Sequence, residues 1–129
     1  MKTFYIASAS DPENVRSVRR LAVDLDHDLQ MEWFFDWTIP VSQEADPAKT
    51  VNPAGAEKDI EAAVNADLFV FLVTATISRG AHIELGARLA VGKEAHIVLR
   101  GNEPYFFYHH PLVTIHESKV QLLTFLGVR

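Results

Sequence analysis

One carboxylate stands out in the segment SRGAHIELGARLA, residues 78–90, which is otherwise composed for packing. Glu84 follows a glycine at position 80 and is flanked on both sides by branched apolar residues. A poorly solvated, ionised carboxylate is a nucleophile for an electron-poor carbon. The alternative is a solvated glutamate in the first turn of a helix, where the helix dipole favours it and Arg88 can form an i,i+4 ion pair with it.

Three local features favour the nucleophile. Gly80 allows the chain to turn and to approach a ligand closely. The start of a helix presents free N–H groups, which stabilise an anion. The preceding run DLFVFLV, residues 67–73, is unbroken and apolar, as expected for a buried parallel strand that anchors the turn rigidly. We therefore predict that Glu84 lies ionised and poorly solvated at a ligand-binding edge.

The elements that must position Glu84 alternate along the chain. Asp11 is placed to cap the first helix and Pro12 takes its first position, while Gly92 is placed to end the helix that contains Glu84. In that helix, apolar residues recur at positions 83, 87, 90 and 91. We predict strands over residues 2–10, 31–37, 67–73, 95–101 and 112–116, and helices over residues 12–29, 57–66, 81–91 and 117–128.

Residues 38–56 hold three prolines and show no usable period, which predicts a long loop with a functional role. Strand–helix alternation predicts right-handed crossovers in a flavodoxin-like, doubly wound α/β fold with about five parallel strands, one domain over residues 1–129. Ligands bind such sheets at the carboxyl ends of the strands. This rule selects residues 7–14, 36–38 and 74–84 and the loop after Arg100.

Three further polar residues fall in the selected places. Ser8 and Ser10 follow the first strand, where they either donate hydrogen bonds to a sugar or phosphate or serve as small residues for packing. Asp36 ends the second predicted strand, where it either contacts a ribose hydroxyl or base or caps a turn. Both alternatives stay open for each residue.

Residues 67–99 resemble the signature of the nucleoside 2-deoxyribosyltransferase-like family. They combine an apolar strand, a glycine turn, ELG opening a helix, GK and a second apolar strand. FYIASAS (residues 4–10) and DWT (residues 36–38) extend the resemblance over about the first hundred residues. The family includes transferases and N-hydrolases that act on deoxynucleosides or nucleoside monophosphates. The resemblance implies N-glycosidic bond cleavage without a cofactor, on a small nucleoside or nucleotide, in a homo-oligomer.

The resemblance also assigns roles. It implies that Glu84 attacks the anomeric carbon and that Asp59 is a second acidic residue of the site, whereas Asp67, at the start of a strand, is structural. Ser78 stands where some transferases carry an acidic residue and matches monophosphate hydrolases, which implies a phosphate contact and favours hydrolysis. His82 replaces a second glycine of the turn and would either crowd the pocket or touch the substrate.

Composition excludes several other classes of protein. The net charge is −5 over 129 residues, which does not suit a protein that binds polymeric nucleic acid. The absence of cysteine excludes disulfides and thiol catalysis and fits a reducing cytoplasm. The longest apolar run is too short to cross a membrane, and the six histidines lack metal-ligand spacing. We predict a cytoplasmic protein with no membrane segment and no metal.

Two other functions remain open. TIR-like domains share this architecture and use a glutamate to cleave the nicotinamide bond of NAD. A non-catalytic nucleotide-binding or sensing module would keep the same pocket. The aromatic segment YFFYHH, residues 105–110, either stacks on a nucleobase and closes over the site or forms a packing or subunit contact.

Overall fold

The computed structural model describes residues 2–43 and 52–128. One sheet of five strands, all parallel, has the order β2-β1-β3-β4-β5. This order confirms a flavodoxin-like α/β fold, in which the strand order reverses between β1 and β3. The strands are β1 Thr3–Ala7, β2 Glu32–Trp33, β3 Leu68–Leu72, β4 Ala95–Val98 and β5 Val113–His116.

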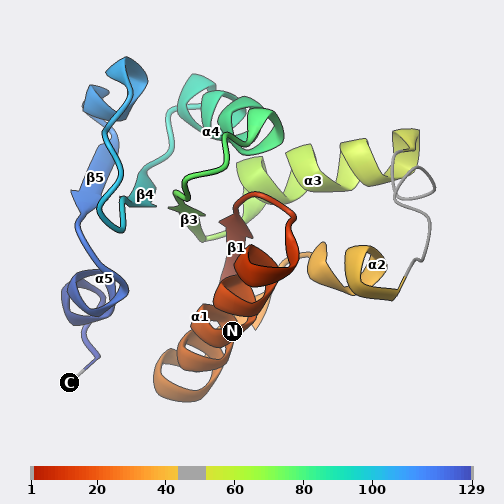
Figure 1. Ribbon diagram of the computed structural model, residues 1–129, viewed down its shortest axis with the longest axis horizontal. Coiled ribbons are helices and arrows are strands. Elements are labelled where there is room, and N and C mark those ends of the chain that lie inside the picture. Colours follow the sequence, from red (N-terminus) through yellow and green to blue (C-terminus); the bar gives the residue numbers. More distant parts are fainter. Residues whose placement is uncertain (1, 44–51, 129) are drawn as a thin grey trace.

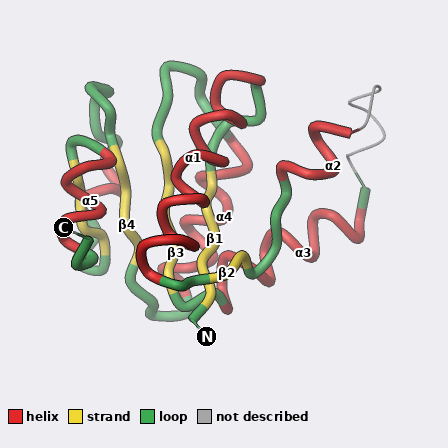
Figure 2. Tube along the Cα trace, turned by 90° about the horizontal axis from the view of Figure 1, so that it is seen from below, coloured by secondary structure: helices red, strands yellow, loops and turns green. Residues whose placement is uncertain are grey.

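Helices cover both faces of the sheet. Figure 1 shows α3 and α4 on one face and α1 and α5 on the other. Figure 2 shows α2 and α3 on the same side of the molecule, beyond β1 and β2. A 3-10 helix, Phe106–His109, precedes β5. The α-helices are α1 Pro12–Leu29, α2 Thr38–Gln43, α3 Pro53–Asn65, α4 Arg79–Ala90 and α5 Lys119–Phe125.

The core lies on both sides of β1 and β3, the central strands. All five residues of β3 are buried, which explains its unbroken apolar sequence. Phe4 of β1 is in register with Leu68, and Ala7 is in register with Phe71. The two strands therefore end together at one edge of the sheet. The segments that follow β1 and β3 therefore both start at this edge of the sheet.

The second strand is shorter than predicted, and the predicted loop contains helices. β2 stops at Trp33, because the chain then turns inward and the indole of Trp37 donates a hydrogen bond of 2.6 Å to the carbonyl of Ile6. Part of the predicted loop, Thr38–Gln43, is α2, and α3 begins at Pro53, before the predicted start. Asn52 caps α3 by accepting a hydrogen bond of 2.8 Å from the amide of Gly55. The remainder, residues 44–51, lies outside the described part of the chain.

The helix ends were predicted with mixed success. Pro12 does take the first turn of α1, but the Asp11 side chain makes no capping hydrogen bond to the helix and instead accepts one from the side-chain amide of Asn14. Gly92 has the expected left-handed backbone after α4, with a φ of 77°. Asp11 therefore occupies the predicted N-cap position, but its carboxylate pairs with a nearby side chain instead of a backbone amide.

The apolar pattern of α4 points away from the core. Ile83 and Val91 are 64% and 51% exposed, whereas the buried face carries Glu84 and Arg88 together with Ala81 and Leu85. Arg88 does not pair with Glu84. Its guanidinium donates to backbone carbonyls at the end of α3 and around β3 and β4, those of Ala63, Ala66, Asp67 and Glu94. The helix thus buries two ionisable residues, one with structural partners and one facing a cavity.

Two buried histidines join β4 to β5. The Nδ1 of His96 lies 3.0 Å from the Nε2 of His116, the rings stack, and Phe125 of α5 covers both. One nitrogen must donate and the other accept, so the accepting ring is neutral and the two rings cannot both be protonated. Burial and the neighbouring His116 lower the pKa of His96 to about 4, and burial also lowers the pKa of His116.

We expect this pair to weaken the fold in acid. Because the folded-state pKa lies below the ordinary value of about 6.5, the pair's contribution to stability is complete above pH 6.5 and is lost as the pH falls toward 4. The loss is at most about 1.4 kcal/mol per pH unit for each histidine. Urea unfolding of the wild type and of a His96→Leu/His116→Leu variant should show the stability difference shifting in favour of the variant over that range. A difference that is independent of pH would contradict the prediction.

No helix in the described residues is long and apolar enough to cross a membrane.

Candidate active site

A cavity of about 420 Å³ opens at the carboxyl ends of β1 and β3. It lies where the strand order of the sheet reverses, the place at which this kind of fold binds ligands. Its walls come from Tyr5 of β1, from the segments after β1 and β2, from α2, and from the first two turns of α3 and α4. The lining residues are Tyr5, Ser8, Ser10, Phe35, Trp37, Pro40, Val41, Asn52, Gly55, Ala56, Asp59, Ser78, Gly80, Ala81 and Glu84.

Glu84 is buried at this cavity, with only 8% of its surface exposed. Tyr5 in the middle of β1 donates a hydrogen bond of 2.8 Å from its hydroxyl to Oε1 of Glu84. Tyr5 itself is 1% exposed and packs near Phe69 of β3, so the hydroxyl is held by the core. The interpretation of Glu84 as a solvated surface residue is therefore wrong, and the expected poor solvation is confirmed.

The surroundings of Glu84 disfavour the ionised state that its sequence context predicts. α4 begins at Arg79 and has no acidic residue in its first turn, so Glu84 lies beyond the turn that the helix dipole stabilises most strongly. Burial raises the pKa of Glu84 to about 8, the Tyr5 hydrogen bond lowers the pKa, and the Asp59 charge raises it again. Near neutral pH the side chain is mostly a protonated acid.

Asp59 of α3 also lines the cavity, and its charge influences both Glu84 and Tyr5. Burial raises the pKa of Asp59 to about 6. Two interacting carboxyl groups titrate as a pair, and the apparent pKa values belong to the pair rather than to either residue. Between about pH 6 and about pH 8 the pair holds one proton, so the cavity contains one carboxylate and one carboxylic acid. This is the arrangement that acid catalysis combined with nucleophilic attack requires.

The start of α4 forms one rim of the cavity. The Oγ of Ser78 caps the helix by accepting a hydrogen bond of 3.1 Å from the amide of Ala81. This leaves the hydroxyl proton of Ser78 for an outside acceptor. Gly80 does not form the expected turn but lies within the helix, without a left-handed backbone. A Cβ atom added to Gly80 would meet no protein atom within 4 Å, so the open space beside it belongs to the cavity rim.

Ser8 and Ser10 alternate along the segment after β1 and both line the cavity. The hydroxyl of Ser8 donates to the carbonyl of Leu72 at 2.8 Å, which ties the end of β1 to the end of β3. Its oxygen can still accept, but donation to a ligand would require this bond to break. Ser10 is exposed, and its hydroxyl makes no hydrogen bond to another described residue. Of the two, Ser10 is the freer donor.

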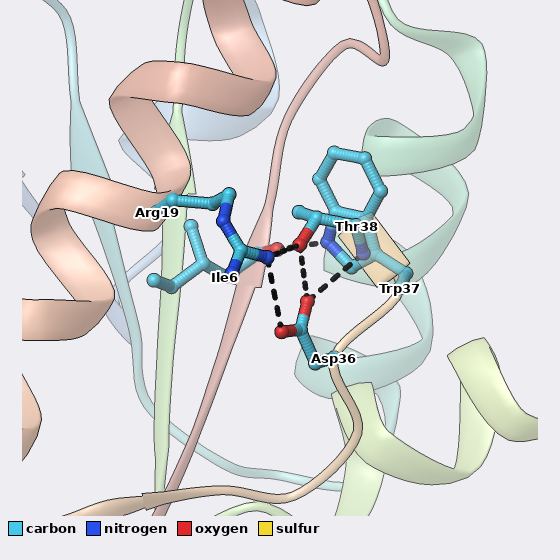
Figure 3. A network of polar contacts seen from close by, with 5 residues as sticks. All are labelled: Ile6, Arg19, Asp36, Trp37 and Thr38. Carbon is cyan, nitrogen blue, oxygen red and sulfur yellow. Dashed lines mark hydrogen bonds and ion pairs between the residues drawn. The ribbon is translucent and has the colours of Figure 1, made fainter. Parts of the chain in front are cut away.

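Asp36 lies outside the cavity lining. Its carboxylate accepts hydrogen bonds from the amide and hydroxyl of Thr38 and lies 3.5 Å from the guanidinium of Arg19 on α1 (Figure 3). The same figure shows Trp37 directed to Ile6, and Trp37 does line the cavity. Asp36 thus holds the segment around Trp37 against α1, through Arg19, and so helps to position Trp37 at the cavity. These contacts fit the capping alternative for Asp36.

His82 also lies outside the lining of this cavity. Its Nε2 lies 2.8 Å from the hydroxyl of Tyr108, its Nδ1 lies 2.6 Å from the carbonyl of Ser78, and its ring stacks on Tyr105. Phe71 meets the ring edge-on. The side chain is therefore fixed in an aromatic cluster that borders a second cavity, and the 105–110 segment supplies two rings of that cluster.

Sequence reasoning missed two groups of residues in the site. Tyr5 sits inside a strand whose pattern indicates only a structural role, and its pairing with Glu84 joins positions 79 residues apart. Phe35, Trp37, Pro40 and Val41 form an apolar wall from the segment predicted as a strand end and loop. The sequence feature that could have indicated this wall is an aromatic-rich run ahead of prolines. Its role became visible only in the structure, where the chain turns inward at Trp37. Asp67, in contrast, accepts hydrogen bonds from Thr3 at the other end of the sheet, as predicted.

Among the described residues, no three or more histidine and acidic side chains gather as a metal-binding group.

No protein-family model matches the chain, and no curated protein matches it. A solved structure that is similar over nearly the whole length is that of the Clostridium botulinum CMP N-glycosidase BcmB. The TM-score is 0.64 at 20% sequence identity, and the match covers 97% of this chain and 98% of that chain. At this identity the similarity establishes a shared fold.

Proposed function

We propose that this protein hydrolyses the N-glycosidic bond of a nucleoside 5′-phosphate, with Glu84 as the nucleophile and Asp59 as the proton donor. The observation that carries the proposal is a buried carboxyl group that faces a cavity, held by Tyr5 and coupled to a second carboxyl group that also lines it. The resemblance of residues 67–99 to deoxyribosyltransferase-like proteins points the same way. So does the fold shared with a CMP N-glycosidase.

The first half of the reaction breaks the bond between C1′ of the sugar and the base nitrogen. Glu84 in its ionised form attacks C1′ and forms a glycosyl ester, while the departing base takes the proton of Asp59. Only the form of the pair with Glu84 ionised and Asp59 protonated is productive. Because Glu84 has the higher pKa, the shared proton lies mostly on Glu84, and the productive form is the less populated one. The positive charge that develops on the sugar favours an ionised Glu84 in the transition state.

The second half restores the enzyme. Asp59, now a carboxylate, takes a proton from water, and the water oxygen attacks C1′ and releases Glu84 as a carboxylate. The apolar wall of Phe35, Trp37 and Val41 is suited to hold the flat faces of a base. A second base that enters this slot before water would accept the sugar instead, which is the transfer reaction.

The rim at the start of α4 supports the 5′-phosphate. Early N–H groups of a helix have no partner inside the helix and bind phosphate oxygens. Ser78 adds a hydroxyl proton at this place, Gly80 leaves room for close approach, and Ser10 lines the same cavity. We place the phosphate here and the base toward α2 and α3.

Base release tests the proposal. The protein is incubated with deoxynucleosides, with nucleoside and deoxynucleoside monophosphates, and with NAD, and free base is followed by chromatography. We expect release from monophosphates that is lost in Glu84→Ala. Nicotinamide release from NAD alone would replace this function by NAD hydrolysis. Tight nucleotide binding without release from any donor would indicate a binding module, and a second base that captures the sugar would indicate transfer.

Gly80→Ala tests the rim. Alanine favours a helix over glycine by up to about 1 kcal/mol, and its Cβ meets no protein atom here, so stability should be kept or increased. The methyl group would, however, occupy space at the phosphate, and we expect kcat/KM to fall at least tenfold for monophosphates. Gly86→Ala is the matched control, because Gly86 is exposed in the same helix, has the same free space and does not line the cavity. Equal activity of the Gly80→Ala and Gly86→Ala variants would exclude this rim as the binding site of the phosphate.

A further inference from the structure

A second cavity of about 230 Å³ lies directly beside the first one. Ser78 lines both cavities, and the segment after β1 divides between them, with Ala9 in the second and Ser8 and Ser10 in the first. The two cavities therefore share a wall made of this segment and the start of α4. They follow one another along the carboxyl edge of the sheet, the second lying near the ends of β3 and β4.

Aromatic rings form one side of the second cavity. The ring centroids of His82, Tyr105 and Tyr108 lie 5.0 to 5.8 Å apart, and the Tyr108 hydroxyl is hydrogen-bonded to His82. Tyr108 is 1% exposed, whereas Tyr105 is 42% exposed. The cluster thus holds the Tyr105 ring in place while leaving part of it accessible. Such a ring stacks on nucleobases, because every base has a flat face.

One carboxylate, that of Glu103, lines this cavity beside hydroxyl and amide groups that can donate or accept. Glu103 is exposed, and within the described residues its carboxylate makes no hydrogen bond or ion pair. An ionised carboxylate only accepts hydrogen bonds, so it pairs with amino or ring N–H groups and repels phosphate. Asn102 is fixed beside it by donating to the carbonyl of Leu99 at 2.8 Å. The cavity therefore matches a base that carries an amino group.

The rim shared by the two cavities offers neutral hydrogen-bond donors, the hydroxyl of Ser78 and the early N–H groups of α4. Donors of this kind can hold the single charge of a phosphodiester as well as a monoester. Because Ser78 lines both cavities, the group that esterifies the phosphate would extend past Ser78 into the second cavity.

We propose that the second cavity binds an amino-bearing nucleoside esterified to the 5′-phosphate, so that the preferred substrate is a dinucleotide rather than a free monophosphate. This inference rests on the proposed function, because it takes the phosphate position from it. The first cavity then holds the nucleotide whose base is released, Ser78 holds the phosphodiester, and Tyr105 and Glu103 hold the second base.

Paired substrates test the inference. CMP, UMP and GMP are compared with ApC, ApU and ApG, in which adenosine esterifies the 5′-phosphate of the same nucleotide, and with UpC, whose uracil lacks the amino group. We expect kcat/KM for base release at the 3′ nucleotide to be at least tenfold higher for each dinucleotide than for its monophosphate, and higher for ApC than for UpC.

Glu103→Leu removes the accepting oxygens and should abolish the preference for ApC over UpC, while leaving monophosphate cleavage within about twofold, since the side chain is exposed and does not line the first cavity. Glu117→Leu is the matched control, at an exposed carboxylate that lines neither cavity. Monophosphate cleavage without a dinucleotide advantage overturns the inference and leaves the proposed function standing. So does an ApC preference that survives Glu103→Leu. No base release from any of these compounds overturns both.

Discussion

Glu84→Gln should remove base release and at the same time make the folded protein more stable in alkaline solution. Glutamine keeps the shape of the side chain and an oxygen that accepts the Tyr5 hydrogen bond, but it cannot form the glycosyl ester. We expect kcat to fall at least about 1,000-fold, as is usual when a nucleophile is lost. The measurement is base release under single-turnover conditions with the best donor of the panel.

The gain in stability follows from the raised pKa of Glu84. Its pKa is about 8 in the folded protein and about 4.5 in the unfolded chain, so the folded state holds its proton more tightly. The contribution of this group is complete below pH 4.5 and is lost as the pH rises through 8, by about 1.4 kcal/mol per pH unit. The amide carries no charge and escapes this loss.

Urea unfolding of the wild type and of Glu84→Gln at several pH values measures the difference. The variant should gain a few kcal/mol on the wild type between pH 5 and pH 8. Glu117→Gln, at an exposed carboxylate, should show no such trend. A stability difference that does not change between pH 5 and pH 8 would contradict the raised pKa of Glu84, and a variant that still releases base at the wild-type rate would exclude Glu84 as the nucleophile.

The pH profile of kcat/KM should be bell-shaped with a maximum near pH 7. Both carboxyl groups are protonated below about pH 6 and both are ionised above about pH 8, so the productive pair with one proton exists only between these values. Activity should fall about tenfold for each pH unit beyond either limb. Asp59→Asn should lose the alkaline limb along with most of the activity, because no proton donor then remains to be titrated.

Tyr5→Phe probes the same pair from the other side. The Tyr5 hydroxyl lowers the pKa of Glu84, so its removal should move the alkaline limb to higher pH and leave less of the nucleophile ionised. A hydrogen bond to a charged group is worth about 1.5–3 kcal/mol, which predicts a loss of roughly 10- to 100-fold in kcat/KM at pH 7. A flat profile in the wild type between pH 5 and pH 9 would contradict the two-carboxyl mechanism.

Local sequence patterns determined the architecture. The apolar run at 67–73 and the strand–helix alternation predicted a five-stranded parallel sheet of flavodoxin type, because burial on both faces imposes that composition on a central strand. The segments that follow the strands could then be placed at one edge of the sheet. Ser8, Ser10, Asp59, Ser78, Gly80 and Glu84 do line one cavity there.

Only the tertiary structure decided what the carboxyl group experiences. The apolar periodicity of α4 indicated the wrong buried face of the helix. The buried face carries Arg88 and Glu84, whose polar groups are paired with residues from distant segments of the chain. The Tyr5 contact, the coupling to Asp59 and the aromatic enclosure of His82 all join residues far apart in the chain. A pKa depends on burial and on charges in space, which adjacent residues do not specify.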